Sequence, residues 1–154
     1  RLVGDGPHKA RLVERACEEG LDMVQFEPHV PRSEIYSLLQ EADAFVITLR
    51  AANLFSRYGV SPNKLFDYLA SGRPIIFAVD SLNNPVGESG GGITVPSEDP
   101  ESMAQAIIRL ANMSSQERWA MGLKGRRHVE QEYDHAKLAD RIEMVLHDVV
   151  GGAN

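Results

Sequence analysis

The chain of 154 residues is 43% hydrophobic and 25% charged, an ordinary composition for a single globular domain with a buried core. Its formal net charge of −6 argues against a nucleic-acid-binding module, and its one cysteine, Cys17, excludes an internal disulfide framework. The sequence shows no signal peptide and no apolar run long enough to span a membrane. We therefore expect a cytoplasmic protein.

The first part of the chain alternates between expected helices and strands. Residues 7–19 read as a helix that stops at Gly20, and residues 23–26 read as a short strand. Residues 44–49 form a nearly continuous apolar run, which is typical of a parallel strand covered on both faces. Between these strands, an amphipathic helix is indicated by the i, i+3, i+4, i+7 spacing of Ile35, Leu38, Leu39 and Ala42.

The middle of the chain continues the alternation. Ser61 is a favourable N-cap and Pro62 suits a first helical position, so we expect a helix over residues 63–71 and a strand over residues 74–79. Another short strand is expected near residues 93–95. A further helix is opened by Asp99 and Pro100, with a core face of Met103, Ala106, Ile107 and Leu110. Strands separated by helices predict an α/β fold with a right-handed parallel sheet.

The last quarter of the chain is expected to be helical. Ser114 and Glu117 form a capping-box pattern, and a second helix begins near His135. Gly122 and Gly125 lie inside the first of these helices, where each costs about 1 kcal/mol relative to Ala, which indicates close packing there. We expect residues 1–113 to form the core, residues 114–150 to be C-terminal helices of the same domain, and residues 151–154 to be a disordered tail.

The junction before residue 63 carries the most informative chemistry. Free backbone N–H groups at a helix start, together with the helix dipole and the Lys64 ammonium, form a site for phosphate. Asp67 follows Asn63 by four residues, so it shares a helix face with it and leans back toward the helix start. A carboxylate there can accept hydrogen bonds from a vicinal diol such as a ribose. Diphosphate donors beside a diol acceptor indicate a nucleotide-sugar site, although Lys64 and Asp67 could also be ordinary surface charges.

Five segments in the right order resemble the nucleotide-sugar-binding half of group 1 glycosyltransferases, glycosyltransferase family 4. The segment that begins at Asp67 reads D-Y-L-A-S-G-R-P, where the family form is close to E-A-M-A-x-G-x-P-V-I. The family's turns V-G-x-G-P, F-x-G-x-V and G-x-G-x-x-V-P-x-x-D-P and its helix M-G-x-x-G-R resemble residues 2–7, 25–30, 90–100 and 121–126. The family's acidic motif has two Glu residues separated by seven positions. The first of them falls on Gly59 and the second on Asp67.

The resemblance implies the C-terminal half of a GT-B fold, which is a Rossmann-like parallel sheet flanked by helices with a helical C-terminal segment. It also implies that the first strand–helix unit and the N-terminal acceptor domain are missing from this chain. The nucleobase would lie near residues 27–30, the ribose near Asp67, the diphosphate near residues 61–64 and the sugar near the loop 50–58. For His29, an ordinary loop role is as well supported as a contact with the base. The implied nucleotide-sugar site comprises Gly6, Glu27, His29, Val30, Gly59, Ser61, Pro62, Asn63, Lys64, Leu65 and Asp67.

The function implied by the resemblance is transfer of a hexose or N-acetylhexosamine from a UDP-, GDP- or ADP-sugar to a saccharide or lipid-linked acceptor. The Ser-Pro-Asn-Lys segment resembles transferases of bacterial surface polysaccharide assembly. No Asp-x-Asp metal motif is present, so we expect neither metal nor cofactor, and we expect the chain alone to be inactive. Two alternatives remain open, a non-catalytic nucleotide-sugar-binding or scaffold module and a nucleotide-sugar 2-epimerase. Peripheral attachment of the parent enzyme to the inner face of the membrane is also left open.

Overall fold

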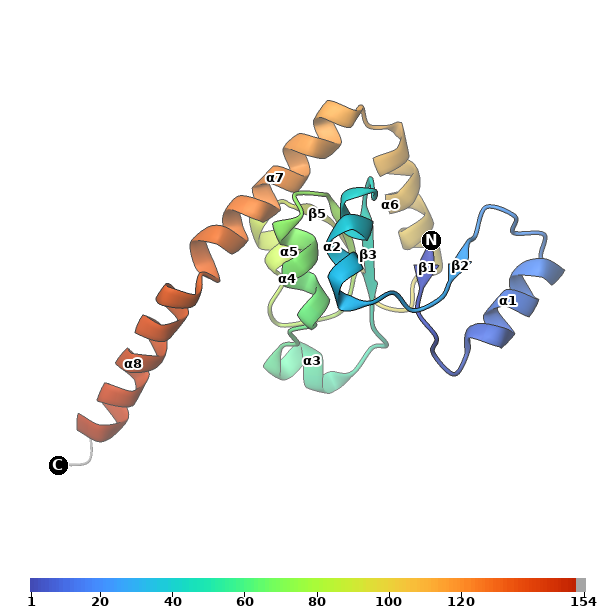
Figure 1. The fold of residues 1–154 in the computed structure, drawn as a ribbon. Helices are drawn as coiled ribbons and strands as arrows, with labels where there is room; N and C mark the ends of the chain where they lie inside the picture. The colour runs from blue at the N-terminus through green and yellow to red at the C-terminus, as the bar shows by residue number, and fades with distance from the viewer. Residues whose placement is uncertain (152–154) are drawn as a thin grey trace. The chain divides into compact units, whose positions relative to one another are not determined.

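The computed structural model describes residues 1–151, which divide into two compact units, Arg1–Glu41 and the chain from Ala42 onward. In both units parallel strands alternate with helices, so the predicted Rossmann-like α/β class is confirmed (Figure 1). The predicted single sheet is present as two, one of two strands and one of three. Of the tail predicted to be disordered, Gly151 ends the last helix, and residues 152–154 lie outside the described residues.

The first unit contains a two-stranded parallel sheet. Its elements in chain order are β1 (Leu2–Val3), α1 (Lys9–Glu18), β2 (Phe26–Glu27) and α2 (Arg32–Gln40). Helix α1 stops before Gly20, which has a φ of 65°, as its sequence predicted. The prediction of a strand over residues 23–26 is wrong except at Phe26, which begins β2. Met23 lies in a turn closed by a hydrogen bond from Val24 N to Leu21 O and is 92% exposed, so no sheet or core covers it.

The second unit is built on the parallel sheet of β3 (Phe45–Thr48), β4 (Ile75–Ala78) and β5 (Gly92–Val95). The central strand β4 is buried along its whole length. On β3, by contrast, Phe45 and Ile47 are buried while Val46 is 43% exposed. The prediction that this strand is covered on both faces is therefore wrong, since β3 is an edge of its sheet and only the face of Phe45 and Ile47 is buried.

The remaining helices of this unit are α3 (Asn53–Tyr58), α4 (Asn63–Ala70), α5 (Pro85–Ser89), α6 (Pro100–Asn112), α7 (Ser115–Glu132) and α8 (His135–Gly151). The core includes Leu65 and Leu69 from α4 and Ala106 and Leu110 from α6. Ile107 was predicted to face the core but is 49% exposed, because it lies at the edge of the α6 apolar stripe. None of the helices within residues 1–151 combines the length and hydrophobicity needed to cross a membrane.

Two side-chain caps set the starts of α6 and α7. Asp99 accepts a hydrogen bond from Ser102 N at 2.9 Å, and Ser114 and Glu117 form the reciprocal capping box that the sequence predicted. Hydrogen bonds from the Ser102 hydroxyl and backbone hold the pKa of Asp99 below its ordinary value. On helix α8, Leu138 is half-buried, whereas four further apolar residues are each at least 58% exposed: Ile142, Val145, Leu146 and Val149.

The predicted close packing at the glycines of α7 is confirmed. A Cβ added at Gly122 would lie 2.5 Å from the carbonyl carbon of Gly72 and closer still to its oxygen. At Gly125, an added Cβ would lie 3.3 Å from Gly91 Cα and 2.8 Å from Leu69 Cδ2. Helix α7 therefore approaches the turn after α4 backbone to backbone, which fixes where α4 lies against the sheet.

Candidate functional site

Helix α4 begins at Asn63, as predicted, but its capping residue lies one position later than predicted. Pro62, with ψ at 125°, is the capping residue, and no side chain caps the helix, so the prediction that Ser61 is the N-cap is wrong. The Leu65 N–H donates to Pro62 O at 2.9 Å, which occupies the third N–H of the helix. Since proline has no N–H, the donors at this helix start are those of Asn63 and Lys64. They lie at the carboxyl edge of the three-stranded sheet, where ligands bind in parallel α/β folds.

The polar side chains at this start face solvent. Asn63, Lys64 and Asp67 are exposed, as is Ser61, whereas Leu65 is fully buried and anchors the helix to the core. Within residues 1–151, no intramolecular hydrogen bond or ion pair engages the side chains of Asn63, Lys64 or Asp67. Their donors and acceptors are thus available to a ligand that carries phosphate and hydroxyl groups.

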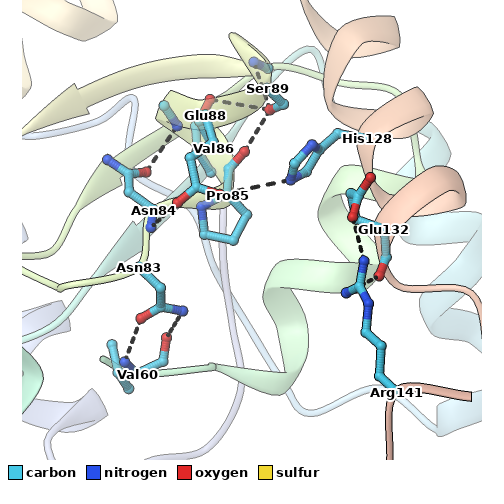
Figure 2. Close-up of polar contacts among 12 residues, drawn as sticks. Val60, Asn83, Asn84, Pro85, Val86, Glu88, Ser89, His128, Glu132 and Arg141 are labelled. Carbon is cyan, nitrogen blue, oxygen red and sulfur yellow. Dashed lines mark hydrogen bonds and ion pairs between the residues drawn. The ribbon is translucent and has the colours of Figure 1, made fainter. Parts of the chain in front are cut away.

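The turn before α4 is held by a side chain from the loop after β4. Figure 2 shows the Asn83 amide against the backbone of Val60. Val60 N donates to Asn83 Oδ1 at 2.8 Å, and Asn83 Nδ2 donates back to Val60 O at 3.0 Å. The Ser81 hydroxyl donates to the same Oδ1 at 2.7 Å and also accepts a hydrogen bond from Val60 N at 3.1 Å. Neither Ser81 nor Asn83 was singled out from the sequence, because a contact between two loops leaves no spacing signal.

Other hydrogen bonds join the loops that follow β3, β4 and β5. Leu82 N donates to Phe55 O at 3.0 Å, and Ala51 N donates to Glu98 Oε2 at 3.1 Å. Asp80 N donates to the Ser97 hydroxyl at 2.8 Å. Residues 50–58 were predicted to be a loop, but six of them form helix α3, and the bond from Leu82 N to Phe55 O holds its C-terminal turn. Three loops therefore form one connected rim at the carboxyl edge of the sheet.

The predicted base-contacting residues cluster separately, within the first unit. The Asp5 carboxylate accepts hydrogen bonds from His29 N and from Lys9 Nζ, both at 2.8 Å. Lys9 also donates to Glu27 O at 2.7 Å. The Lys9 bond, followed by that of His29, holds the pKa of Asp5 below its usual range. The segment 27–29 is thus fastened to the turn that contains Gly6, and of the His29 backbone groups the carbonyl is the one left for a ligand. Val30, next in the chain, is half-buried.

Glu27 is paired rather than open. Arg1 donates to both of its carboxylate oxygens, with Nη2 at 2.9 Å from Oε2, and also to Glu41 at 2.6 Å. The hydrogen bonds from Arg1 lower the pKa of Glu27. A ligand near Glu27 would meet a carboxylate already paired with a guanidinium instead of a free one. No group of three or more His, Cys, Asp or Glu side chains in the described chain could hold a metal ion.

A parallel α/β fold with polar groups gathered at a helix start by the carboxyl ends of its strands belongs to the class that binds ligands at that edge. Residues 1–113 match the sequence model of the family described as "Glycosyl transferases group 1", and the chain belongs to this family. It is 25% identical over 150 residues to the putative colanic acid biosynthesis glycosyltransferase WcaL of Escherichia coli (strain K12). That match covers 95% of this chain and 36% of WcaL, so the chain spans about a third of the relative's length.

Proposed function

We propose that this chain is the donor-binding part of a glycosyltransferase that moves a hexose or N-acetylhexosamine from a nucleoside-diphosphate sugar. The acceptor is a saccharide or a lipid-linked saccharide of a surface polysaccharide. The family match carries the proposal, and the similarity to a glycosyltransferase of colanic acid biosynthesis supports the polysaccharide context. We assign residues 1–113 to the nucleotide-sugar-binding core and residues 114–150 to C-terminal helices of the same domain, in a cytoplasmic enzyme.

The start of α4 is suited to the charge that develops in such a reaction. When the glycosidic bond breaks, the leaving nucleoside diphosphate gains negative charge that must be stabilised. The N–H groups of Asn63 and Lys64, the helix dipole and the Lys64 ammonium lie together at this start and supply that stabilisation without a metal. Asp67, on the same exposed face, accepts hydrogen bonds from the ribose diol. None of the described residues is assigned a role as nucleophile or base.

One observation favours the alternative of a binding module without catalysis. The first acidic position of the family motif is Gly59, which has a φ of 80° and no room for a side chain, since an added Cβ would lie 3.1 Å from Asn83 Cγ and closer to its oxygen. A side chain at this position would strain the backbone and displace the Asn83 amide. Sugar transfer by the protein that contains this chain, with a lipid-linked acceptor, would decide for the enzyme.

The direct test is a thermal-shift and calorimetry screen of the 154-residue chain against UDP-, GDP- and ADP-sugars. We expect one class of nucleotide to stabilise the folded chain, with the same affinity in EDTA as in Mg²⁺, and no transfer of sugar by this chain alone. The donor-binding proposal would be rejected if none of the three bound a chain shown to be folded by circular dichroism. A strict requirement for Mg²⁺ would reject the metal-free stabilisation.

A further inference from the structure

We propose that Asn83 is a positioning residue that holds the phosphate-binding turn in its binding geometry. Its amide forms two hydrogen bonds with the Val60 peptide, which lies three residues before the first helical residue of α4. The inference rests on the proposed function, because it assumes that the start of α4 receives the diphosphate. It adds a residue from a different loop, with no part in the acidic motif, to the machinery of that site.

The chemistry of the contact requires an amide. Oδ1 receives two donors, Val60 N and the Ser81 hydroxyl, while Nδ2 faces a carbonyl acceptor, so the orientation of the amide is consistent with all three partners. An aspartate would keep the acceptor but would bring a carboxylate oxygen against Val60 O. Alanine would remove both Asn83 bonds and leave Val60 N with the Ser81 hydroxyl and Val60 O with water.

Asn83 also occupies the space beside Gly59. Gly59 has a left-handed φ of 80°, and a Cβ at this position would press on the Asn83 amide, so the observed position of Asn83 depends on glycine at position 59. In this chain, the place beside the turn is filled by a side chain from the loop after β4 rather than by one from position 59. The Gly59–Val60 backbone is therefore held from outside the segment that carries the ligand donors.

A turn that is already ordered favours binding, because the entropy lost when a loop becomes ordered on binding lowers the affinity for the ligand. Only Ser61 and Pro62 separate Val60, which is held by the Asn83 amide, from Asn63 and Lys64. Backbone motion at Val60 would therefore also move the N–H groups proposed to bind phosphate. Leu82 N, bound to Phe55 O at 3.0 Å, ties the other end of the same turn. Loss of the Asn83 amide should thus weaken binding of the diphosphate and leave contacts with the base and ribose unchanged.

The experiment compares Asn83→Ala and Asn83→Asp with wild type and with a control, Asn112→Ala, at an exposed position at the end of α6. UDP, GDP and ADP, and uridine, guanosine and adenosine, are titrated into each ¹⁵N-labelled chain by NMR. We expect both Asn83 variants to bind the preferred diphosphate about tenfold more weakly, as expected for the loss of a net hydrogen bond. Affinity for the matching nucleoside should stay within twofold, and the control should match wild type throughout.

The outcomes separate this inference from the function on which it rests. If wild type binds no diphosphate, the proposed function fails first. If wild type binds and both Asn83 variants bind the diphosphate equally well, Asn83 has no positioning role, although the donor site stands. An equal loss for diphosphate and nucleoside would show a general structural role and would also overturn the inference. Should Asn83→Ala fail to fold, Asn83→Leu, which keeps the approximate shape without the amide and without the charge that would itself repel a diphosphate, decides in its place.

Discussion

The close approach of α7 to the turn after α4 predicts that Gly122→Ala destabilises the chain. On helix propensity alone, replacing this glycine would stabilise the helix by about 1 kcal/mol. The new methyl group, however, would lie 2.5 Å from the Gly72 carbonyl carbon and 2.8 Å from Arg73 Cα, and both are backbone atoms that cannot rotate away. Forcing apart a packed contact of this kind costs roughly 1–3 kcal/mol and more when backbone must move, so the steric cost exceeds the gain in propensity.

We expect a net loss of about 1–2 kcal/mol in the free energy of unfolding, measured by urea denaturation followed by circular dichroism. The matched control is Ala120→Gly, the opposite change on the exposed side of the same helix, which should cost about 1 kcal/mol through propensity alone. If Gly122→Ala were more stable than wild type, α7 would not approach Gly72 as closely as the structure shows. The position of α4 would then need another explanation.

Two further predictions concern carboxylates. The pKa of Asp99 is lowered in the folded state, so its cap stabilises the chain above the ordinary value of 3.8 and is lost as the pH falls through the lower folded value. Asp99→Asn should therefore lose less stability than wild type between pH 6 and pH 3 in urea denaturation, and equal losses would argue against the charged cap. Asp67→Asn should weaken nucleoside-diphosphate binding about ten- to a hundredfold in calorimetry, because a hydrogen bond to a charged group contributes roughly 1.5–3 kcal/mol. Asp148→Asn, at an exposed position of α8, should leave that binding unchanged, and an unchanged Asp67→Asn would count against the ribose contact.

Local sequence signals predicted those parts of the fold that depend on neighbouring residues. The capping box at Ser114, the cap at Asp99 and the apolar run of β4 all appear where they were expected. The short helices α3 and α5 were missed. The start of α5 could have been predicted, since Asn84 caps it and Pro85 is its first residue. Helices of only six and five residues, however, are stabilised mainly by the loops that they contact, and these contacts are not visible in the sequence.

Errors in the predicted strands came from partners that a single segment does not reveal. The apolar run at residues 44–49 correctly indicated a strand, but whether Val46 is covered depends on which elements pack on β3. The observed pairs are β1 with β2, β3 with β4 and β4 with β5, so each pair joins strands that follow one another in the chain.

The candidate site also has parts that a local sequence pattern predicts and parts that depend on distant segments. The groups proposed to bind the diphosphate and ribose lie within five residues, from Asn63 to Asp67, and were therefore found from a local pattern of charge and helix position. The geometry in which they are presented comes from residues 81–83, which approach the turn only because β3 and β4 are neighbours in the sheet. A motif can keep its donors and lose its function if those distant contacts change. In this chain, the effect of glycine at the first acidic position, Gly59, should therefore be tested together with the contacts that residues 81–83 make with the turn.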